Sequence, residues 1–203
     1  MKDPTIPVFD FGGVLIDWNP RHLFRQLFRG DDAKMEYFLS HICSPEWNLM
    51  QDAGRSFAEA TAALSARYPE YETLIMAYHQ RWEEMIAGAI MDTVTLLYAL
   101  KQRGLPLYGI TNWSAETFAL TRRRFEFFEL FDGMIISGEV RLLKPNPEIF
   151  HCFLNTYGLA ADECLFIDDS IKNVDGAKAV GMDAVHFESP PQLARVLRAK
   201  RLL

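Results

Sequence analysis

Short apolar segments alternate with segments of helical periodicity along most of this chain. The apolar segments are Ile6–Phe9, Leu105–Ile110, Gly133–Ser137, Cys164–Ile167 and Asp183–Phe187. They lack a polar alternation, as is typical of strands that a parallel sheet buries on both faces. Helices are predicted between them, over about 93–102, from 114, over 148–157, over 170–180, and again after 187. Strands separated by helices of this length predict right-handed βαβ units and an α/β fold with a parallel sheet.

The alternation is interrupted directly after the first predicted strand. From Pro20 to about Ala87 the sequence has a helical character and no clear strand, with apolar and aromatic residues at helical spacing. Phe57, Ala60 and Leu64 form one such set. Because an insertion of this length is too long for a plain loop, we expect a helical lid on the α/β core.

The composition limits the class of protein. The chain has 203 residues, of which 49% are hydrophobic and 24% charged, as in an ordinary soluble globule. Its net charge of −6 argues against a nucleic-acid partner, because such binders normally carry a basic footprint. The basic stretch Arg195–Leu203 is interpreted as the solvated face of a terminal helix.

Cysteine usage and the N-terminal sequence favour a cytoplasmic location. Cys43, Cys152 and Cys164 are scattered and form no C-x-x-C pair, so neither a disulfide framework nor a zinc site is expected. The polar segment 1–10 lacks the apolar region of a signal peptide. No apolar run approaches the roughly 20 residues of a membrane span, so no membrane partner is expected.

Polar residues follow four of the apolar segments, where each predicted strand ends. They are Asp10, Thr111 with Asn112, Lys144, and the pair Asp168–Asp169. In open parallel sheets the carboxyl ends of the strands form the ligand-binding edge. Since these residues come from the same edge of one predicted sheet, we expect them to form one site.

The residue types at this edge indicate a phosphoryl and metal site. Converging carboxylates repel one another unless a cation lies between them, and hard oxygen ligands with open positions suit Mg²⁺. Gly12 and Gly13 beside Asp10 allow the backbone to approach a metal or an anion closely. Thr111, with a helix start behind it, is typical of phosphate binding, and Lys144 can neutralise charge on transferring oxygens.

The order of the segments "FDFGG", "ITNWS", "LKPNPEIF" and "FIDDSIKN" resembles the haloacid dehalogenase (HAD) superfamily over essentially the whole chain. The resemblance implies a Rossmann-like core, 1–16 with 88–203, and a helical C1 cap domain over 17–87 that determines substrate specificity. In that family the first aspartate is a nucleophile that forms a covalent aspartyl intermediate, so Asp10 would take this role.

The resemblance also assigns the other residues of the site. Thr111 would hold the phosphoryl group and Lys144 would stabilise both nucleophile and phosphoryl group, while the substrate-binding set as a whole is Gly12, Gly13, Thr111, Asn112 and Lys144. The implied Mg²⁺ ligands are Asp10, the Gly12 carbonyl, Asp168 and Asp169, with Asp169 the preferred direct carboxylate of the acidic pair. Asn173 would orient the acidic loop.

The sequence departs from the commonest family pattern at one position. Most phosphatases of the family carry a second aspartate two residues after the nucleophile as general acid/base, and this chain has Gly12 there. Proton transfer of this kind contributes typically 10²–10⁴-fold, so its loss matters. Either the leaving group needs little protonation, as in a sugar 1-phosphate, or another residue supplies the acid. Asp17, His22 and His41 are the candidates in the sequence.

Three functions fit these observations. The leading hypothesis is a Mg²⁺-dependent phosphatase that acts on a small phosphorylated metabolite, with sugar phosphates among the candidates. A metal-independent 2-haloacid dehalogenase would use the same Asp10, because halide needs no proton, but it would leave the acidic pair without a partner. A non-catalytic HAD-fold binding protein is the third. In the cap, Arg21 is a candidate anion contact, and Trp47, Phe57 and Trp82 either line the pocket or pack.

Overall fold

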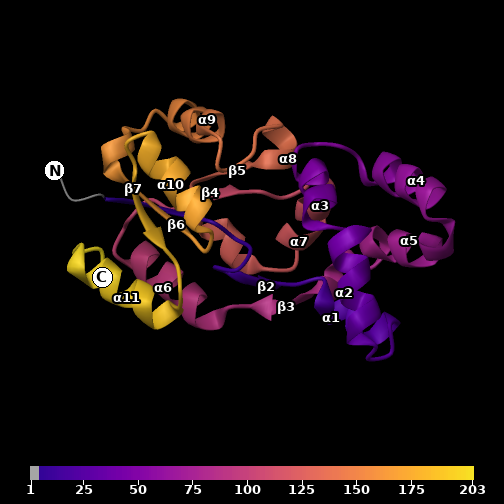
Figure 1. The fold of residues 1–203 in the computed structure, drawn as a ribbon. Helices are drawn as coiled ribbons and strands as arrows, with labels where there is room; N and C mark the ends of the chain where they lie inside the picture. The colour runs from indigo at the N-terminus through magenta and orange to yellow at the C-terminus, as the bar shows by residue number, and fades with distance from the viewer. Residues whose placement is uncertain (1–4) are drawn as a thin grey trace.

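Five parallel strands in the order β5-β4-β1-β6-β7 form the central sheet of the computed structural model, which describes residues 5–203 (Figure 1). The strands are β1 (Ile6–Phe9), β4 (Tyr108–Thr111), β5 (Gly133–Ile136), β6 (Cys164–Asp168) and β7 (Asp183–His186). In the central strand, Val8 pairs with Tyr108 of β4 and with Phe166 of β6. The predicted α/β class, with a Rossmann-like parallel sheet between helices, is confirmed.

Helices cover both faces of this sheet. On one face lie α6 (Met91–Gln102), α7 (Ala115–Arg122) and α11 (Pro190–Ala199), and on the other lie α9 (Pro147–Tyr157) and α10 (Ile171–Ala179). Neighbouring side chains of a strand point to opposite faces, so Phe9 joins the first buried cluster and Val8 the second. Both faces of the strands are therefore buried, as their continuous apolar sequences predict.

A helical insert lies at the end of the molecule opposite α11 (Figure 1). It contains α1 (Arg21–Leu27), α2 (Asp32–His41), α3 (Pro45–Asp52), α4 (Phe57–Arg67), α5 (Glu72–Gln80) and the 3₁₀ turns η1 (Pro69–Tyr71) and η2 (Trp82–Met85). Ser44 and Ser56 begin α3 and α4, because their side chains accept hydrogen bonds from the backbone N–H groups of Trp47 and Glu59. The insert is helical, as the sequence predicts.

The strands that lead into and out of the insert were not predicted. β2 (Ile16–Trp18) and β3 (Ile86–Ala89) pair antiparallel, and β3 overlaps a range expected to contain no strand. Both are very short, and the sequence "IAGA" of β3 contains a single β-branched residue, Ile86, and no aromatic one. The pair joins the insert to the core through two adjacent chain segments.

Two boundaries in the core also differ from the prediction. β4 begins at Tyr108 rather than Leu105, because Pro106 has no N–H to donate and the Leu107 N–H bonds to the Asp132 carboxylate instead. Ser137 does not end β5 but begins the short helix α8 (Ser137–Val140). The remaining 3₁₀ turns are η3 (Glu126–Leu130) and η4 (Ala161–Glu163).

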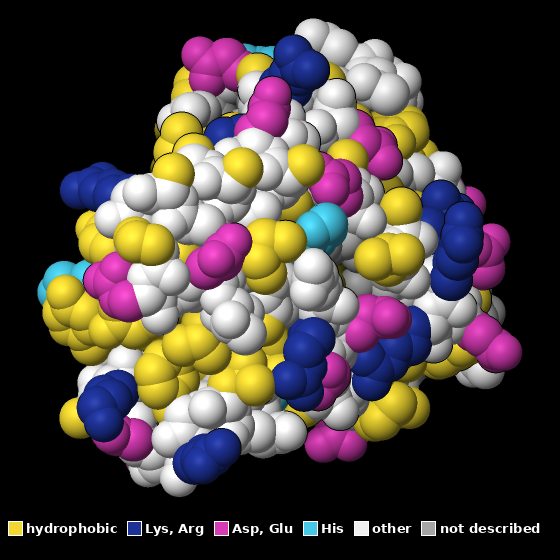
Figure 2. Space-filling view, turned by 90° about the vertical axis from the view of Figure 1, so that its right-hand side faces the viewer, with side chains coloured by type: hydrophobic (Ala, Val, Ile, Leu, Met, Phe, Trp, Pro, Cys, Tyr) yellow, Lys and Arg dark blue, Asp and Glu magenta, His cyan; other side chains and the backbone are white. Residues whose placement is uncertain are grey.

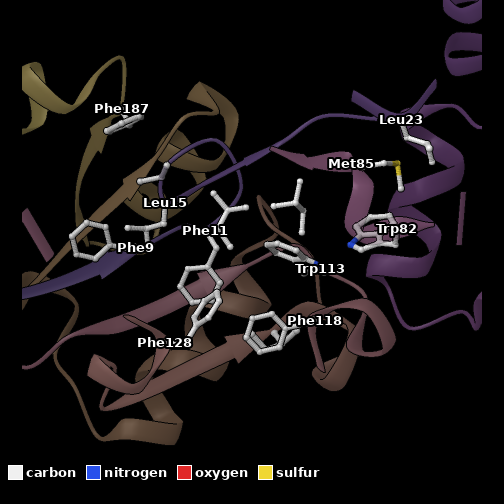
Figure 3. Close-up of a cluster of buried hydrophobic side chains, with 14 of the residues drawn as sticks. Phe9, Phe11, Leu15, Leu23, Trp82, Met85, Trp113, Phe118, Phe128 and Phe187 are labelled. Carbon is white, nitrogen blue, oxygen red and sulfur yellow. The ribbon is translucent and has the colours of Figure 1, made fainter. Parts of the chain in front are cut away.

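The apolar core runs from the sheet into the insert without a break. Figure 3 shows buried side chains from Phe9 and Phe11 near the sheet, through Trp113, to Trp82 in the insert. The ring of Trp82 stacks on Trp18, with 5.3 Å between the ring centroids. The core and the insert are therefore packed as one body.

The surface of the insert end carries mixed side chains. Figure 2 shows Lys and Arg side chains interspersed with Asp, Glu and apolar groups over this face. In α11, Arg195 and Arg198 are exposed while Leu193 and Leu197 are buried, as expected for the solvated face of a terminal helix.

Among residues 5–203, no helix combines the length and apolar character that a membrane crossing requires. The three cysteines are free.

Candidate active site

Asp10 directly follows β1 at the carboxyl edge of the sheet. Its backbone N–H donates to the Ile167 carbonyl of β6 at 2.8 Å, so the ladder between the strands holds its position. Its Oδ1 accepts a hydrogen bond from the Phe11 N–H at 2.7 Å and lies 2.9 Å from Lys144 Nζ. The residue is only 7% exposed. The central strand thus presents one buried carboxylate, fixed at backbone and side chain.

Lys144 joins three strand ends through its ammonium group. Nζ lies 2.9 Å from Asp10 Oδ1, 2.7 Å from Asp168 Oδ2 and 3.0 Å from the Ile110 carbonyl of β4. Asn112 fixes the lysine backbone, since its side chain donates to the Lys144 carbonyl at 3.0 Å and accepts from the Lys144 N–H at 2.9 Å. The Asn112 side chain, a predicted substrate contact, therefore holds the lysine loop.

The adjacent carboxylates Asp168 and Asp169 have different surroundings. Asp168 is fully buried, and its oxygens accept hydrogen bonds from the Ser170 N–H, the Asn173 amide and Lys144. Asp169 is exposed. Asp168 therefore anchors the loop, and Asp169 presents the more accessible carboxylate. Asn173 contacts the acidic loop as the resemblance implies.

Gly13 allows Asp169 to approach the loop after β1. A Cβ atom on Gly13 would lie 2.2 Å from Asp169 Oδ2, and Gly13 has a φ of +72°, which disfavours any other residue. Gly12 has no such constraint, because a Cβ there would meet nothing within 4 Å. Packing and backbone conformation therefore require a glycine at position 13, whereas position 12 has space for a side chain.

Asp10, Asp168 and Asp169 form a carboxylate cluster whose ligand atoms all lie within 4.8 Å of one another. Burial, and then the charges of Asp168 and Asp169, raise the pKa of Asp10 against the opposing effect of Lys144. Reduced hydration beside the buried members of the cluster, and then the charge of Asp168, also raise the pKa of Asp169. Burial lowers the pKa of Lys144, but the two carboxylates outweigh it and raise the pKa overall. One ammonium thus faces three carboxylates, and the cluster has room for further positive charge.

Thr111 ends β4 beside this cluster and is buried. Two residues later the Trp113 N–H donates to Ser137 Oγ at 2.9 Å, and α7 starts at Ala115. The loop after Thr111 therefore turns at once into a helix N-terminus, the geometry that the sequence predicts for an anion site.

A small cavity of about 70 Å³ lies between the strand-end loops and the insert. Gly12, Asn112 and Trp113 line it from the core, and Trp18, Asn48, Asp52 and Trp82 line it from β2 and the insert. Trp82 thus both packs and lines the cavity, whereas Trp47 and Phe57 pack against Tyr78, with ring centroids 5.2 and 6.5 Å away. Asn48 and Asp52 were not predicted from the sequence as residues of the cavity wall. The signal for Asp52 was a carboxylate at the end of a helix, where the dipole disfavours it.

The residues proposed in the sequence to replace the missing acid lie elsewhere. Asp17 and His22 form an exposed pair with each other, 3.1 Å apart. His41 is exposed on α2 and stacks on Tyr37. Arg21, the candidate anion contact, is engaged in the insert, because Nε and Nη2 each lie 2.6 Å from a carboxylate oxygen of Glu36. These four side chains therefore have structural partners outside the cavity.

A buried carboxylate–lysine pair at the strand ends, with an acidic pair beside it and a helical insert above it, defines a class of α/β hydrolases. The model of the haloacid dehalogenase-like hydrolases matches residues 7–181. The chain therefore belongs to the haloacid dehalogenase-like hydrolase family, as its motifs indicate.

Comparisons with individual proteins include both phosphatases and dehalogenases. The chain is 26% identical over 196 residues to a sesquiterpene phosphatase of Aspergillus oryzae, covering 97% of this chain and 95% of that one. It is 26% identical over 141 residues to (S)-2-haloacid dehalogenase 1 of a Pseudomonas species, covering 70% of this chain and 59% of that one. A HAD family enzyme from Bacteroides thetaiotaomicron, in complex with magnesium and inorganic phosphate, shares the fold with a TM-score of 0.69 and 23% identity. The match covers 91% of this chain and 94% of that enzyme.

Proposed function

We propose that this protein is a Mg²⁺-dependent phosphatase that hydrolyses a small phosphorylated metabolite through a covalent phosphoryl intermediate on Asp10. The observation that carries the proposal is the cluster of three carboxylates, two of which, Asp10 and Asp168, share one buried lysine at 2.9 and 2.7 Å. The phosphatase of Aspergillus oryzae, matched over nearly its whole length, supports the same reaction class.

The ligand atoms in the cluster fit Mg²⁺. Carboxylate oxygens within 4.8 Å of one another form the hard oxygen set that this cation prefers, and it would leave positions for waters and a substrate phosphate. Asp10 and Asp169 would hold the ion with the Gly12 carbonyl, while Asp168, whose oxygens already accept several hydrogen bonds, would contribute mainly through the loop. When bound, Mg²⁺ neutralises charge on the phosphoryl oxygens and positions the phosphoryl group.

The residues of the site divide the chemistry between them. A carboxylate oxygen of Asp10 attacks phosphorus, the bond from phosphorus to the ester oxygen breaks, and the phosphoryl group is held on Asp10. Water then attacks phosphorus and releases inorganic phosphate and free Asp10. Lys144 favours the ionised form of Asp10, against the effect of burial, and balances charge on the phosphoryl oxygens. Thr111 with the N–H groups after β4 binds those oxygens.

The helical insert, residues 17–87, serves as the cap of this site and selects the substrate. It contributes Asn48, Asp52 and Trp82 to the wall of the cavity that Gly12 and Asn112 line from the core. A cap in this position excludes water from the reacting phosphoryl group. The phosphoryl end of the substrate would meet the strand ends, and its remaining part would meet these cap residues.

The dehalogenase alternative uses the same nucleophile with a different electrophile. Asp10 would attack carbon and displace halide, with no role for Asp169. An accessible carboxylate beside Asp10 would repel the carboxylate of a 2-haloacid, so the acidic cluster favours a cation and a phosphate ester. Halide release from 2-chloropropionate that persists in excess EDTA would revive this alternative.

The test is hydrolysis of p-nitrophenyl phosphate by the purified protein, with Mg²⁺ or with excess EDTA. Activity should require Mg²⁺, and Asp10→Asn should lower it by on the order of 10³-fold or more, as for loss of a covalent nucleophile. Asp17→Asn is the matched control, because Asp17 is an exposed carboxylate on β2 that pairs with His22, outside the carboxylate cluster. Full activity of Asp10→Asn, or activity indifferent to EDTA, would contradict the proposal.

A further inference from the structure

The buried carboxylate of Asp52 is the one acidic side chain that the insert contributes to the wall of the cavity. Asp52 is the last residue of α3 and is 7% exposed. It lines the cavity together with Gly12 and Asn112, which follow Asp10 and Thr111 in their loops. Asp52 and Gly12 therefore line the same cavity from the insert and from the core.

Contacts from both sides of the cavity hold Asp52 in place. Its Oδ2 accepts a hydrogen bond from Asn48 Nδ2 at 3.1 Å, one turn earlier in α3. The Ser114 N–H, at the start of α7 in the core, lowers the pKa of this carboxyl group and so favours its ionised form. The backbone carbonyl of Asp52 accepts a hydrogen bond from Ser137 Oγ at 2.6 Å. Asn48 of the insert thus orients the Asp52 side chain, and Ser137 of the core fixes its backbone, as a residue that acts on a bound substrate needs to be.

The surroundings of Asp52 allow both protonation states near neutrality. Burial raises its pKa to about 7, against the lowering effects of the Ser114 N–H and of Lys144. Its position at the C-terminal end of α3 disfavours the ionised form as well. The other titratable group that interacts with it is the buried Tyr78 on α5. A carboxyl group with this balance can both donate and accept a proton at the working pH.

We propose that Asp52 is the general acid/base of the phosphatase reaction and takes the role that Gly12 leaves vacant beside the nucleophile. This inference rests on the proposed function of the site. It is carried by the geometry: a buried residue of the cap, whose carboxylate is held by Asn48 and whose backbone is held by Ser137 of the core, lines the cavity that Gly12 also lines.

The proton follows the phosphoryl group through both steps. In the first, the Asp52 carboxylic acid gives its proton to the ester oxygen as the bond between that oxygen and phosphorus breaks, so the alcohol leaves neutral. In the second, the Asp52 carboxylate takes a proton from the water that attacks phosphorus. The bond from phosphorus to Asp10 then breaks, phosphate leaves, and Asp52 is again a carboxylic acid.

Asp52→Asn tests this role when it is assayed with a series of phenyl phosphates whose leaving phenols range from p-nitrophenol to phenol. The amide keeps an oxygen to accept from the Ser114 N–H but carries no proton to donate. With phenyl phosphate the rate should fall by about 10²–10⁴-fold, the usual contribution of general acid/base catalysis. With p-nitrophenyl phosphate the first turnover should fall far less, giving a burst of p-nitrophenol followed by slow turnover.

Two further variants separate chemistry from structure. Gly12→Asp in the Asp52→Asn background should restore much of the phenyl phosphate rate, because a side chain at Gly12 meets nothing within 4 Å at its Cβ. Glu116→Gln is the matched control for a contact between core and insert, since Glu116 accepts a hydrogen bond from the Phe57 N–H at 3.0 Å. The rates of this variant should depend on the leaving group in the same way as those of the wild type.

The outcomes distinguish this inference from the proposed function itself. If Asp52→Asn slows all leaving groups equally and shows no burst, Asp52 is only a structural contact and the inference is wrong. If the wild type hydrolyses no phosphate ester, or if Asp10→Asn is as active as the wild type, the proposed function fails instead.

Discussion

The strand-end loops and the helical insert contribute to the same cavity in contrasting ways. In the loops Lys144 and Asp168 each have several partners: Lys144 Nζ contacts three oxygens, and Asp168 accepts from the Ser170 N–H, Asn173 and Lys144. In the insert, Asp52 is held by Asn48 and by backbone contacts, beside apolar rings. The core thus pairs two buried carboxylates with one ammonium group, whereas the insert holds the buried carboxylate of Asp52 through the amide of Asn48.

Removing the lysine gives the largest effect that this comparison predicts. Lys144→Met leaves the buried carboxylates of Asp10 and Asp168 without their shared cation. The free energy of unfolding should fall by about 3–5 kcal/mol, as when one partner of a buried ion pair is removed. Urea denaturation at pH 7.5 without Mg²⁺ measures it, and phosphatase activity should be lost. Lys101→Met is the control, because it breaks an ion pair with Asp132 in which both side chains are about a third or more exposed. This variant should lower the free energy of unfolding by at most about 1 kcal/mol. Equal losses would contradict the contrast between buried and surface pairs.

The glycine pair tests how tightly the loop after β1 is packed. Gly13→Ala places a Cβ 2.2 Å from Asp169 Oδ2 at a φ of +72°, so Asp169 must move. We expect Mg²⁺ affinity, measured by calorimetry, to fall by roughly 10–100-fold, the usual range for disturbed metal-ligand geometry. Gly12→Ala, where the Cβ has free space, should bind Mg²⁺ with an affinity close to that of the wild type. A Gly13→Ala variant with unchanged affinity would argue against Asp169 as a ligand.

The raised pKa of Asp52 predicts a pH-dependent stability difference. A carboxyl group whose pKa is higher in the folded state, here about 7, binds a proton more tightly when folded. Stability from this group is therefore present below its unfolded pKa and is lost as the pH rises to about 7. Asp52→Asn removes this loss, so the variant should gain on the order of 1–4 kcal/mol relative to the wild type between pH 4 and pH 8.

Thermal denaturation of the two proteins across this range measures the difference. Lys144 and Tyr78, which also interact with Asp52, are present in both proteins, so the difference isolates the Asp52 carboxyl group. A constant difference at all pH values would mean that Asp52 is ionised throughout, which would remove its ability to donate a proton.

The reactivity of the cysteine thiols compares the packing of the insert with that of the sheet. This is the smallest effect that we expect. Cys43 follows α2 in the insert and Cys164 lies in β6, and burial raises the pKa of both thiols, that of Cys164 to about 12. Cys152 on α9 is only half-buried. Iodoacetamide on the native protein should therefore modify Cys152 first, as followed by peptide mass spectrometry. Early modification of Cys43 would show that the insert opens more readily than the sheet.

The sequence was sufficient to predict the sheet and its edge residues, because three of these residues lie at or directly after the end of an apolar strand and Lys144 lies in the loop that follows β5 and α8. Asp10, Thr111, Lys144 and Asp168 could be grouped without coordinates, since parallel strands end at the same edge. The division of work between Asp168 and Asp169 was less accessible, because it depends on the bonds from Ser170 and Asn173 and on the space at Gly13.

The contribution of the insert could not be predicted in the same way. Asp52 gains its position from the packing of α3 against the loop that contains Ser114 and against Ser137, both far away in the sequence. Arg21 shows the opposite case, since a residue that seemed free to bind an anion is engaged by Glu36 from the next helix. In both cases the contacts of the residue depend on segments that are separate in the sequence, so the local sequence pattern could not predict them.

Trapping the phosphorylated enzyme tests directly whether Asp10 carries the phosphoryl group. The Asp52→Asn variant, in which breakdown of the intermediate should be slow, is mixed with p-nitrophenyl phosphate and Mg²⁺, quenched in acid, and analysed by mass spectrometry. The account predicts the added mass of one phosphoryl group on the peptide that contains Asp10, and no such peptide in the variant that also carries Asp10→Asn. A phosphoryl group on another residue, or turnover without any phosphorylated enzyme, would contradict it.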